Sequence, residues 1–353
     1  CRMNQKKNKI LTKILLSISI LSFFLIILSS GFANLLYFYI YSLLVSIGTS
    51  ALIFICFQYL LKSGWSKDLE EIALYISEFI LYSLIFIPYF ILIYFVDDCD
   101  IISSKLDYLS QKSNFLNIYF NSYIFFSRII IYYIIWTYVY LKVKNKGSNN
   151  GIYLILMFFS LTFFSIDLLS VIVNVDHLWY SSIFGVYFIF SGLSGAVALI
   201  ILLFILSSND PSKEVKYNIG KYFFTLNILW AYVAFSQYLI IWYGNLPDEM
   251  SFFANRMING WEYLALFIAV YHLVLPFFLL ISKSAKRNNS VLYISAIMVI
   301  IAYVIEIYWI MRPSHYPHEF SVSFEFVFSF IFILSVILIH PLRKMKVYDP
   351  EKL

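Results

Sequence analysis

Long apolar runs, each followed by a short polar segment, recur along the whole chain of 353 residues. A helix that crosses a bilayer needs about 20 mostly apolar residues, and it satisfies its own backbone polar groups within the lipid. The runs are too long for barrel strands, and they lack the alternation of apolar and polar residues that barrels need. The pattern therefore predicts an all-α integral membrane protein.

Ten such runs predict about ten transmembrane helices. They are 14–33, 36–61, 74–96, 116–141, 151–173, 181–207, 219–242, 260–282, 290–311 and 320–341. Composition agrees, since 61% of the residues are hydrophobic and 13% are charged, whereas a soluble domain usually carries about a quarter charged residues. We expect a single polytopic membrane domain over residues 1–353, because the loops are too short to form a soluble domain.

The basic residues predict how the chain is oriented. If the N-terminus is inside, twenty of the 25 Lys and Arg residues fall in inner segments. Only Lys105, Lys112, Arg256 and Arg312 fall in outer segments, and Arg128 lies within a predicted helix. Since cytoplasmic loops carry an excess of Lys and Arg, both termini are predicted to be cytoplasmic. This inner basic collar also accounts for the net charge of +5 and suits anionic lipids rather than nucleic acid.

Six ionisable side chains are predicted to lie at depth in the spans, where a charge is costly and therefore indicates function. They are Glu78, Arg128, Asp167, His272, Glu306 and Glu325. Judged by depth alone, Glu78 and His272 would serve the inner half of a proton path. Asp167, Glu306 and Glu325 would serve the outer half. For Glu306 and Glu325 the alternative is that their carboxylates reach out to water at the helix ends.

Arg128 and Asp167 each allow two interpretations. Arg128 lies near the middle of its run, with Tyr132 and Asn121 on the same helical face. It is either the counter-ion of a buried carboxylate or lipid headgroup, or half of a structural ion pair. A desolvated Asp167 can take up and release protons, whereas an Asp167 bound to Arg128 or to a hydroxyl group would be structural.

His272 precedes Pro276 by four residues in a predicted helix. Proline has no N–H to give to the carbonyl of His272, so we expect a kink with a polar cavity or a file of water molecules there. The alternative is a core histidine with satisfied hydrogen bonds. A haem b is disfavoured, because the sequence offers no second axial histidine at that depth. We expect no metal site.

The segment WAYVAFSQYLIIWYGNLPDEM, residues 230–250, ends an apolar helix with an acidic corner. Ser236 and Gln237 bring hydrogen-bonding groups into the helix, as a buried polar network requires. Asp248 and Glu249 follow a Gly-Asn-Leu-Pro turn on the predicted outer side. They either meet a partner or accept departing protons, or they form a solvated cap.

This segment closely resembles a signature of the ActF-type membrane subunit of alternative complex III, a bacterial quinol:cytochrome c oxidoreductase of the NrfD/PsrC-like superfamily. The shared features are the Phe-Ser-Gln-Tyr core, the Trp-Tyr-Gly-Asn-Leu-Pro turn and the acidic pair. Further segments similar to that family follow the family's order, at 55–78, 108–128, 162–188 and 260–287. The chain departs from the family at Glu70 and Glu71, where basic residues are expected, and at Asp248, where glutamate is usual.

The resemblance implies a ten-helix subunit with two four-helix bundles and two extra helices in the bacterial inner membrane. It implies partners: a homologous quinol-oxidising membrane subunit, an iron–sulfur subunit, c-type cytochrome subunits and a terminal oxidase. Haem c and iron–sulfur clusters would belong to those partners, and this chain would hold no cofactor and no catalytic redox centre of its own. Contact with quinone is left open. The implied role is a proton path or energy-coupling element and a scaffold.

Three other classes are weighed against this interpretation. A quinone-binding anchor of a polysulfide- or nitrite-reductase-type complex would share the fold, but we would not expect its sequence to contain the WYGNLPDE turn. A secondary transporter could have ten helices, but the sequence lacks paired Gly- or Pro-broken helices in corresponding halves. A membrane acyl- or glycosyltransferase would need a catalytic constellation. His315, His318 and Glu319 instead fit a loop between helices.

Overall fold

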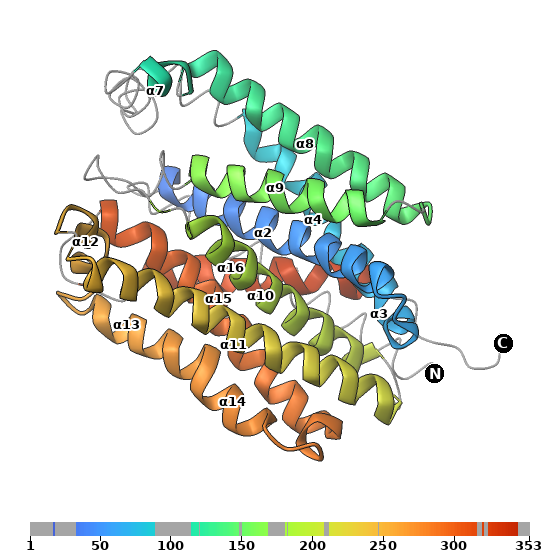
Figure 1. Ribbon diagram of the computed structural model, residues 1–353. Coiled ribbons are helices and arrows are strands. Elements are labelled where there is room, and N and C mark those ends of the chain that lie inside the picture. Colours follow the sequence, from blue (N-terminus) through green and yellow to red (C-terminus); the bar gives the residue numbers. More distant parts are fainter. Residues whose placement is uncertain are drawn as a thin grey trace.

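Every regular element that the computed structural model describes is a helix (Figure 1). The described residues are 17, 33–88, 114–119, 121–147, 150–168, 181, 183–207, 212–245, 247–315, 320 and 324–344. Within these residues, seven helices are long and apolar enough to cross a membrane. They are Tyr37–Leu60, Tyr123–Lys144, Asn150–Leu168, Phe184–Ser207, Lys213–Tyr243, Trp261–Leu280 and Asn289–Pro313.

The prediction of an all-α chain is confirmed for the described residues, and seven of their helices have the length and apolarity that a membrane span requires. The helices described are α2 Ala33–Leu60, α3 Lys67–Ser77, α4 Phe79–Ser83, α7 Asn114–Tyr119, α8 Ser122–Lys144, α9 Asn150–Leu168, α10 Phe184–Ser207, α11 Lys213–Tyr243, α12 Pro247–Ala254, α13 Trp261–Ile268, α14 Leu275–Leu280, α15 Asn289–His315 and α16 Phe324–Lys344. The predicted run 14–33 lies almost entirely outside the described residues. The run 320–341 corresponds to α16, whose described apolar stretch, Phe330–Ile339, is shorter than a span.

The predicted run 74–96 is not one continuous helix in its described part. Helix α3 ends at Ser77, a turn follows at Glu78, and α4 continues only to Ser83 before a short 3₁₀ segment. Here α4 crosses α2 at Gly48, where an added Cβ would lie 2.9 Å from the backbone nitrogen of Ile80. The break lets α4 come close to α2, a packing constraint that hydropathy does not reveal.

The run 116–141 is also divided, because α7 ends at Tyr119 and α8 begins at Ser122. Asn121 stands between the two helices, and its side-chain oxygen accepts a hydrogen bond from the backbone N–H of Tyr123 at 3.1 Å. Asparagine is a favoured N-cap residue for this reason. Asn121 thus starts α8 and does not extend the polar face of Arg128.

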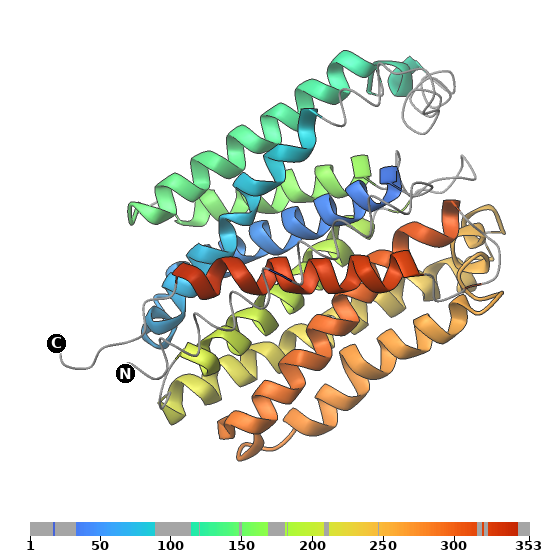
Figure 2. The ribbon, with the colours of Figure 1, turned by 180° about the vertical axis from the view of Figure 1, so that it is seen from behind.

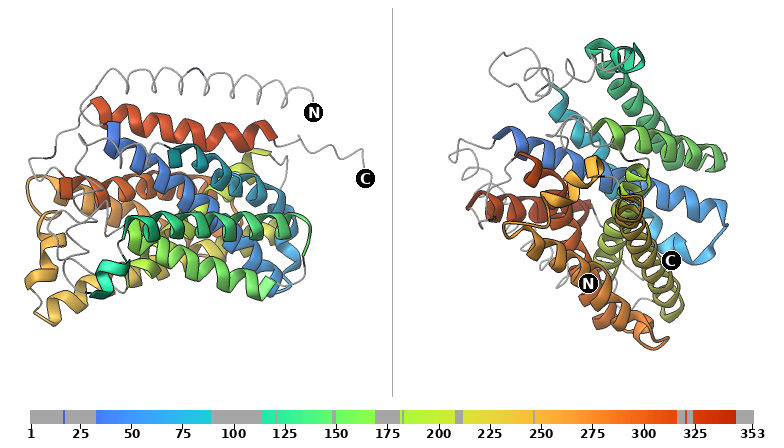
Figure 3. Two further views of the ribbon diagram at one scale, coloured as in Figure 1. Left: turned by 90° about the horizontal axis from the view of Figure 1, so that it is seen from above. Right: turned by 60° about the vertical axis from the view of Figure 1, so that its left-hand side comes forward.

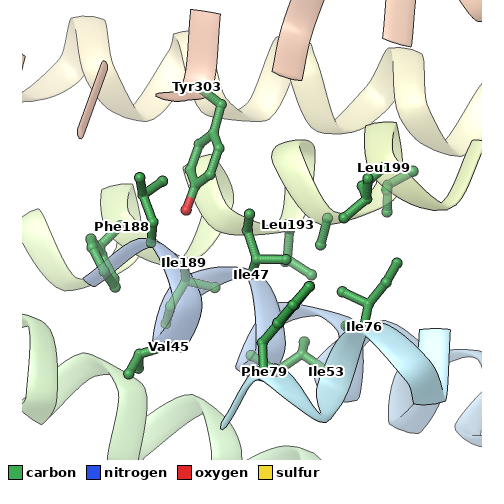
Figure 4. Close-up of a cluster of buried hydrophobic side chains, with 14 of the residues drawn as sticks. Val45, Ile47, Ile53, Ile76, Phe79, Phe188, Ile189, Leu193, Leu199 and Tyr303 are labelled. Atoms are coloured by element: carbon green, nitrogen blue, oxygen red, sulfur yellow. The ribbon is translucent and has the colours of Figure 1, made fainter. Parts of the chain in front are cut away.

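Helices α2 and α10 form a buried central pair, and each of them belongs to one of two groups of helices (Figure 2). The first helix group comprises α2, α3, α4, α8 and α9. The second helix group comprises α10, α11, α13, α14 and α15. Figure 3 shows α8 and α9 side by side at the edge of the first group. Side chains of both groups meet in the core, where Val45 and Ile47 of α2 lie near Phe188 and Leu193 of α10 (Figure 4).

Small residues allow the central helices to approach closely. A Cβ added at Gly192 of α10 would lie 2.4 Å from the Ser46 hydroxyl and 2.5 Å from the Ser50 hydroxyl of α2. One added at Gly195 would lie 2.7 Å from the ring of Tyr303 on α15, which is 1% exposed. Close backbone approach at small residues is a common way for membrane helices to associate, because dispersion contacts then replace lipid contacts.

Several helix ends that carry basic residues lie at one end of the molecule. The end of α8, the start of α11 and the end of α14 lie on the same side as α3 (Figure 1). Lys286, in the turn between α14 and α15, donates a hydrogen bond to the carbonyl of Ile281 at 3.1 Å. Burial lowers the pKa of this ammonium group. The alternation of basic loops found in the sequence agrees with this arrangement.

We expect Gly195→Ala to destabilise the chain, because the new methyl group would overlap the buried Tyr303 ring. Overpacking of this kind costs about 1–3 kcal/mol, and it opposes the gain of roughly 1 kcal/mol in helix propensity. Thermal unfolding in detergent would show a lower midpoint temperature. Gly64→Ala is the control, since nothing lies within 4 Å of its added Cβ. Equal midpoints for the two variants would contradict this account of the packing.

Candidate functional site

Asp167 in the first helix group and Glu306 in the second are buried carboxylates at corresponding positions along their helices. Asp167 follows the first residue of α9 by 17 positions, and Glu306 follows the first residue of α15 by 17 positions. Both side chains are buried, with 3% and 0% of their residue surface exposed. Since an isolated carboxylate at such depth is costly, the groups around each one decide what it can do.

Asp167 is held by the guanidinium group of Arg128. Nη2 of Arg128 donates to Oδ1 at 2.9 Å and Nε donates to Oδ2 at 3.1 Å, which gives a bidentate pair. The hydroxyl of Tyr132 also donates to Oδ2, at 2.8 Å. Three hydrogen bonds, two of them from a permanent cation, therefore meet this carboxylate. The structure thus contains the ion pair that the sequence offered as one of two interpretations.

Arg128 is fixed from its other side by Tyr119. Nη1 donates to the carbonyl of Tyr119, and the guanidinium carbon lies 3.8 Å from the centre of that ring. Deeper in the group, Tyr132 stacks on Trp136, whose indole N–H donates to the Ser160 hydroxyl at 2.9 Å. Ser160 precedes Asp167 by seven positions, so both side chains lie on the same face of α9.

Glu306 is an acceptor for several donors from other helices. The Tyr187 hydroxyl and the Trp230 indole N–H donate to Oε1, the latter at 2.7 Å. The Ser191 hydroxyl donates to Oε2 at 2.7 Å. Nδ1 of His272 lies 3.4 Å from Oε2. The expectation that Glu306 reaches water is therefore wrong, because α15 is covered by α10, α11 and α13 where Glu306 lies.

His272 lies within a π-helical turn, Ala269–Val274, between α13 and α14. Pro276 follows this turn and cannot donate to the carbonyl of residue 272, so the local widening takes the place of the predicted kink. The His272 ring stacks on Trp230, with centroids 3.8 Å apart and planes 12° apart. It contacts Glu306 directly, and the assignment of His272 and Glu78 to an inner half-path stays a prediction.

A chain of hydrogen bonds continues from His272 into α11. Nε2 of His272 lies 2.9 Å from the Ser194 hydroxyl, which in turn donates to Oδ1 of Asn227. Which of these groups donates depends on the tautomer of His272, since either ring nitrogen can carry the proton of a neutral imidazole. The second imidazole nitrogen, Nδ1, faces Oε2 of Glu306, so an imidazole and a carboxylate meet in the interior of the second helix group.

The remaining predicted residues lie apart from these two networks. Glu78 is buried and accepts a hydrogen bond from the Tyr140 hydroxyl at 3.1 Å, and Lys144 donates to that hydroxyl at 3.3 Å. Ser236 is half-buried, whereas Gln237 is buried beside a cavity. The side chains of Asp248, Glu249 and Glu325 lie outside the described part of the structure.

Arg256, which sequence reasoning placed in an outer segment, is fully buried. Its Nε donates to the carbonyl of Trp309 at 3.1 Å, its Nη2 to that of Ile310, and its Nη1 to that of Phe252 at 2.7 Å. In an α-helix the Trp309 carbonyl would accept from residue 313, which here is Pro313 and has no N–H. Arg256 therefore supplies the hydrogen bond that the proline removes.

Several residues of these networks were not singled out from the sequence as site residues. Trp230 and Tyr187 were visible only as members of the segments that carry the family resemblance. Ser194 and Asn227 lie in apolar runs where a single small polar residue is common. Arg256 could have been found from the proline that follows Trp309 by four residues, but its partner helix is 53 positions away along the chain.

The fold and the site define a polytopic helical membrane protein with two buried carboxylate networks. Among the residues described, no three His, Cys, Asp or Glu side chains lie close enough together to hold a metal ion. A comparison with models of known protein families finds no match, and a comparison with curated protein sequences finds none either. Function is therefore argued from the networks themselves.

We expect Arg256→Met to lower the free energy of unfolding by about 3 kcal/mol, because buried carbonyl groups lose charged donors. Pro313→Ala restores an N–H for the Trp309 carbonyl. The double variant should therefore lose less than the sum of the two single variants, as measured by thermal unfolding in detergent. Strictly additive losses would show that Arg256 does not compensate for Pro313.

The pair between Arg128 and Asp167 gives a second double-mutant cycle. Arg128→Gln alone leaves a carboxylate buried without its cation and should cost about 3–5 kcal/mol. The combination with Asp167→Asn removes both charges and should recover a large part of that loss. The readout is the unfolding midpoint in detergent. A double variant that is less stable than either single variant would contradict a pair formed mainly by charge.

Proposed function

We propose that this chain is a membrane subunit of a respiratory quinol:cytochrome c oxidoreductase of the alternative complex III type. Its role would be proton transfer coupled to the redox reaction, together with a scaffold for partner subunits. The observation that carries the proposal is the buried contact between His272 and Glu306, whose Nδ1 and Oε2 lie 3.4 Å apart within the second helix group. Protonatable pairs buried in membrane helices are typical of proton relays.

The two carboxylates suit different tasks in such a subunit. Asp167 faces the permanent charge of Arg128, and this ion pair links α8 to α9 in the first helix group. Glu306 faces an imidazole that can itself gain or lose a proton, so it can exchange protons without leaving an uncompensated charge. We therefore assign proton transfer to the second helix group and structural support to the first.

The proposal includes ten transmembrane helices in two four-helix bundles with two extra helices, and both termini in the cytoplasm of a bacterial cell. The alternating basic loops support this topology, as does the packing of α10, α11, α13 with α14, and α15 into one group. The redox centres would reside in iron–sulfur and c-type cytochrome partners, beside a homologous quinol-oxidising membrane subunit. Glu78 would lie towards the cytoplasmic entry, near Tyr140 and Lys144.

Purification in mild detergent tests the assignment to this complex. An affinity tag on this chain should retain subunits that contain haem c and iron–sulfur clusters, with quinol:cytochrome c reductase activity. A chain that purifies alone and exchanges a solute across liposomes would be a transporter, which would contradict the proposal.

The same complex in liposomes tests the role of Glu306. In Glu306→Gln we expect the redox-driven pH change to slow roughly 100-fold, as is usual when a proton-transferring group is lost. Asp68→Asn is the control, since it neutralises an exposed carboxylate outside both networks. Unchanged proton release in Glu306→Gln, with the complex intact, would remove the proton-transfer role and leave the subunit as a scaffold.

A further inference from the structure

Three exposed cations surround one tyrosine ring near the start of α11. Nζ of Lys221 lies 4.6 Å from the centre of the Tyr217 ring, and Nζ of Lys283 lies 5.6 Å from it. The guanidinium carbon of Arg287 lies 5.1 Å from the same centre. We call these four residues the Tyr217 cluster. Because the face of an aromatic ring attracts cations, Tyr217 helps to gather the three charges.

The turn between α14 and α15 carries two of these cations, Lys283 and Arg287, and it packs against α11. Gly220 of α11 permits this approach, because an added Cβ would lie 3.1 Å from Cβ of Lys286 and 3.2 Å from its carbonyl oxygen. Lys286 itself is buried, and its ammonium group donates to the carbonyl of Ile281. The turn is thereby held in place, while Lys283 and Arg287 remain on the surface beside Lys221.

The Tyr217 cluster has no counter-ion within the described part of the chain. The acidic and basic side chains that meet within 4 Å there are Arg128 with Asp167 and His272 with Glu306. Glu214, the one acidic residue of α11, takes part in neither contact. Cations that converge on one ring repel each other, so an anion bound between them would be stabilised.

The cluster lies at the level where a membrane presents its headgroups. Helix α11 has 31 residues, so it is about 46 Å long, whereas the hydrocarbon core of a bilayer is about 30 Å thick. Lys283 follows the apolar span that ends at Leu280 by three residues, and Arg287 precedes the span that begins at Asn289 by two. The three charges therefore lie at the border of the apolar layer.

An apolar surface continues from the Tyr217 cluster along α11 and α14. Phe224 and Ile228 follow Tyr217 by seven and eleven positions, so all three lie on one face of α11. Phe224 stacks on Phe277 of α14, with ring centres 5.3 Å apart, and the neighbouring Phe278 is 68% exposed. Cations next to an exposed apolar surface match a phospholipid, whereas free phosphate would need the cations alone.

We propose that the Tyr217 cluster binds the phosphate group of an anionic phospholipid, whose acyl chains lie along α11 and α14. Basic pockets between membrane helices bind anionic headgroups in this way. The site differs from a general attraction of basic loops to an anionic leaflet, because charges from two segments converge on one ring. The inference goes beyond the proposed function, since it requires neither redox partners nor proton transfer.

Photoaffinity labelling tests the site on the full chain, purified with its associated subunits and placed in phosphatidylcholine nanodiscs. Two probes carry the same diazirine on one acyl chain, phosphatidylglycerol and phosphatidylcholine, and labelled peptides of this chain are mapped by mass spectrometry. We expect the phosphatidylglycerol probe to label α11 and α14 roughly tenfold more than the phosphatidylcholine probe does. Unlabelled phosphatidylglycerol should suppress this labelling, and an excess of inorganic phosphate should not.

A triple variant removes the charges of the cluster. With Lys221→Gln, Lys283→Gln and Arg287→Gln together, the ratio of labelling by the two probes should fall to about one, because no cation is left to hold the phosphate. A second triple variant, Lys221→Arg, Lys283→Arg and Arg287→Lys, keeps the charges and should keep the ratio. All three side chains are exposed, so we expect the unfolding midpoint in detergent to be unchanged.

The matched control removes three other exposed cations at the same end of the molecule. It combines Lys67→Gln at the start of α3 with Lys142→Gln and Lys146→Gln at the end of α8. These residues belong to the first helix group and do not converge on one ring. The net charge falls by the same amount as in the first variant, but the labelling ratio at α11 and α14 should not change.

Four results would overturn the proposal. The first is a labelling ratio near one in the unaltered chain, as would be found if an acidic segment of a partner subunit covered the cluster. The second is an unchanged ratio in the variant that lacks the three cations. The third is an equal fall in the matched control, which would show that net charge alone attracts the lipid. The fourth is loss of labelling in inorganic phosphate, which would identify free phosphate as the ligand.

Discussion

The cost of placing a carboxylate inside a bundle of membrane helices governs this structure. Each buried acid must be met by donors from other helices, because neither lipid nor the apolar core can stabilise its charge. Asp167 takes its donors from α8, and Glu306 takes donors from α10 and α11 and faces His272 between α13 and α14. These contacts fix how the helices of each group are arranged. Close packing of α2 against α10 then joins the two groups.

The two networks share a position along their helices but differ in chemistry. The partner of Asp167 is a guanidinium group, which keeps its proton under all physiological conditions. The partner of Glu306 is an imidazole stacked on Trp230, whose charge depends on one proton. A pair with a permanent cation stabilises the fold, whereas a pair of two titratable groups can exchange a proton. This difference is why we place proton transfer in the second helix group and not in both.

Hydropathy was sufficient to predict the class of fold and most helix bounds, because length and apolarity alone decide whether a helix can span a bilayer. Hydropathy did not predict the helix break at Glu78, where α4 comes close to Gly48 of α2. It also did not predict the break near Asn121, whose side chain caps the start of α8. The rarity of ionisable residues at depth identified Asp167, His272 and Glu306. The contact between His272 and Glu306 was not predictable from the sequence. The two residues lie on consecutive helices, but packing decides how each helix is rotated about its axis and therefore which side chains meet. The burial of Arg256 was not predicted, because a loop position does not reveal that the chain folds back over α15.

The protonation of Glu306 is the quantity that tests this account most directly. Infrared difference spectroscopy of the complex during turnover would detect the carbonyl stretch of a carboxylic acid as it gains or loses its proton. We predict a band that is absent in Glu306→Gln, shifts when His272 is replaced, and is unchanged in Asp167→Asn. A spectrum without that band, or with the band lost in Asp167→Asn instead, would contradict the assignment of proton exchange to the Glu306 network.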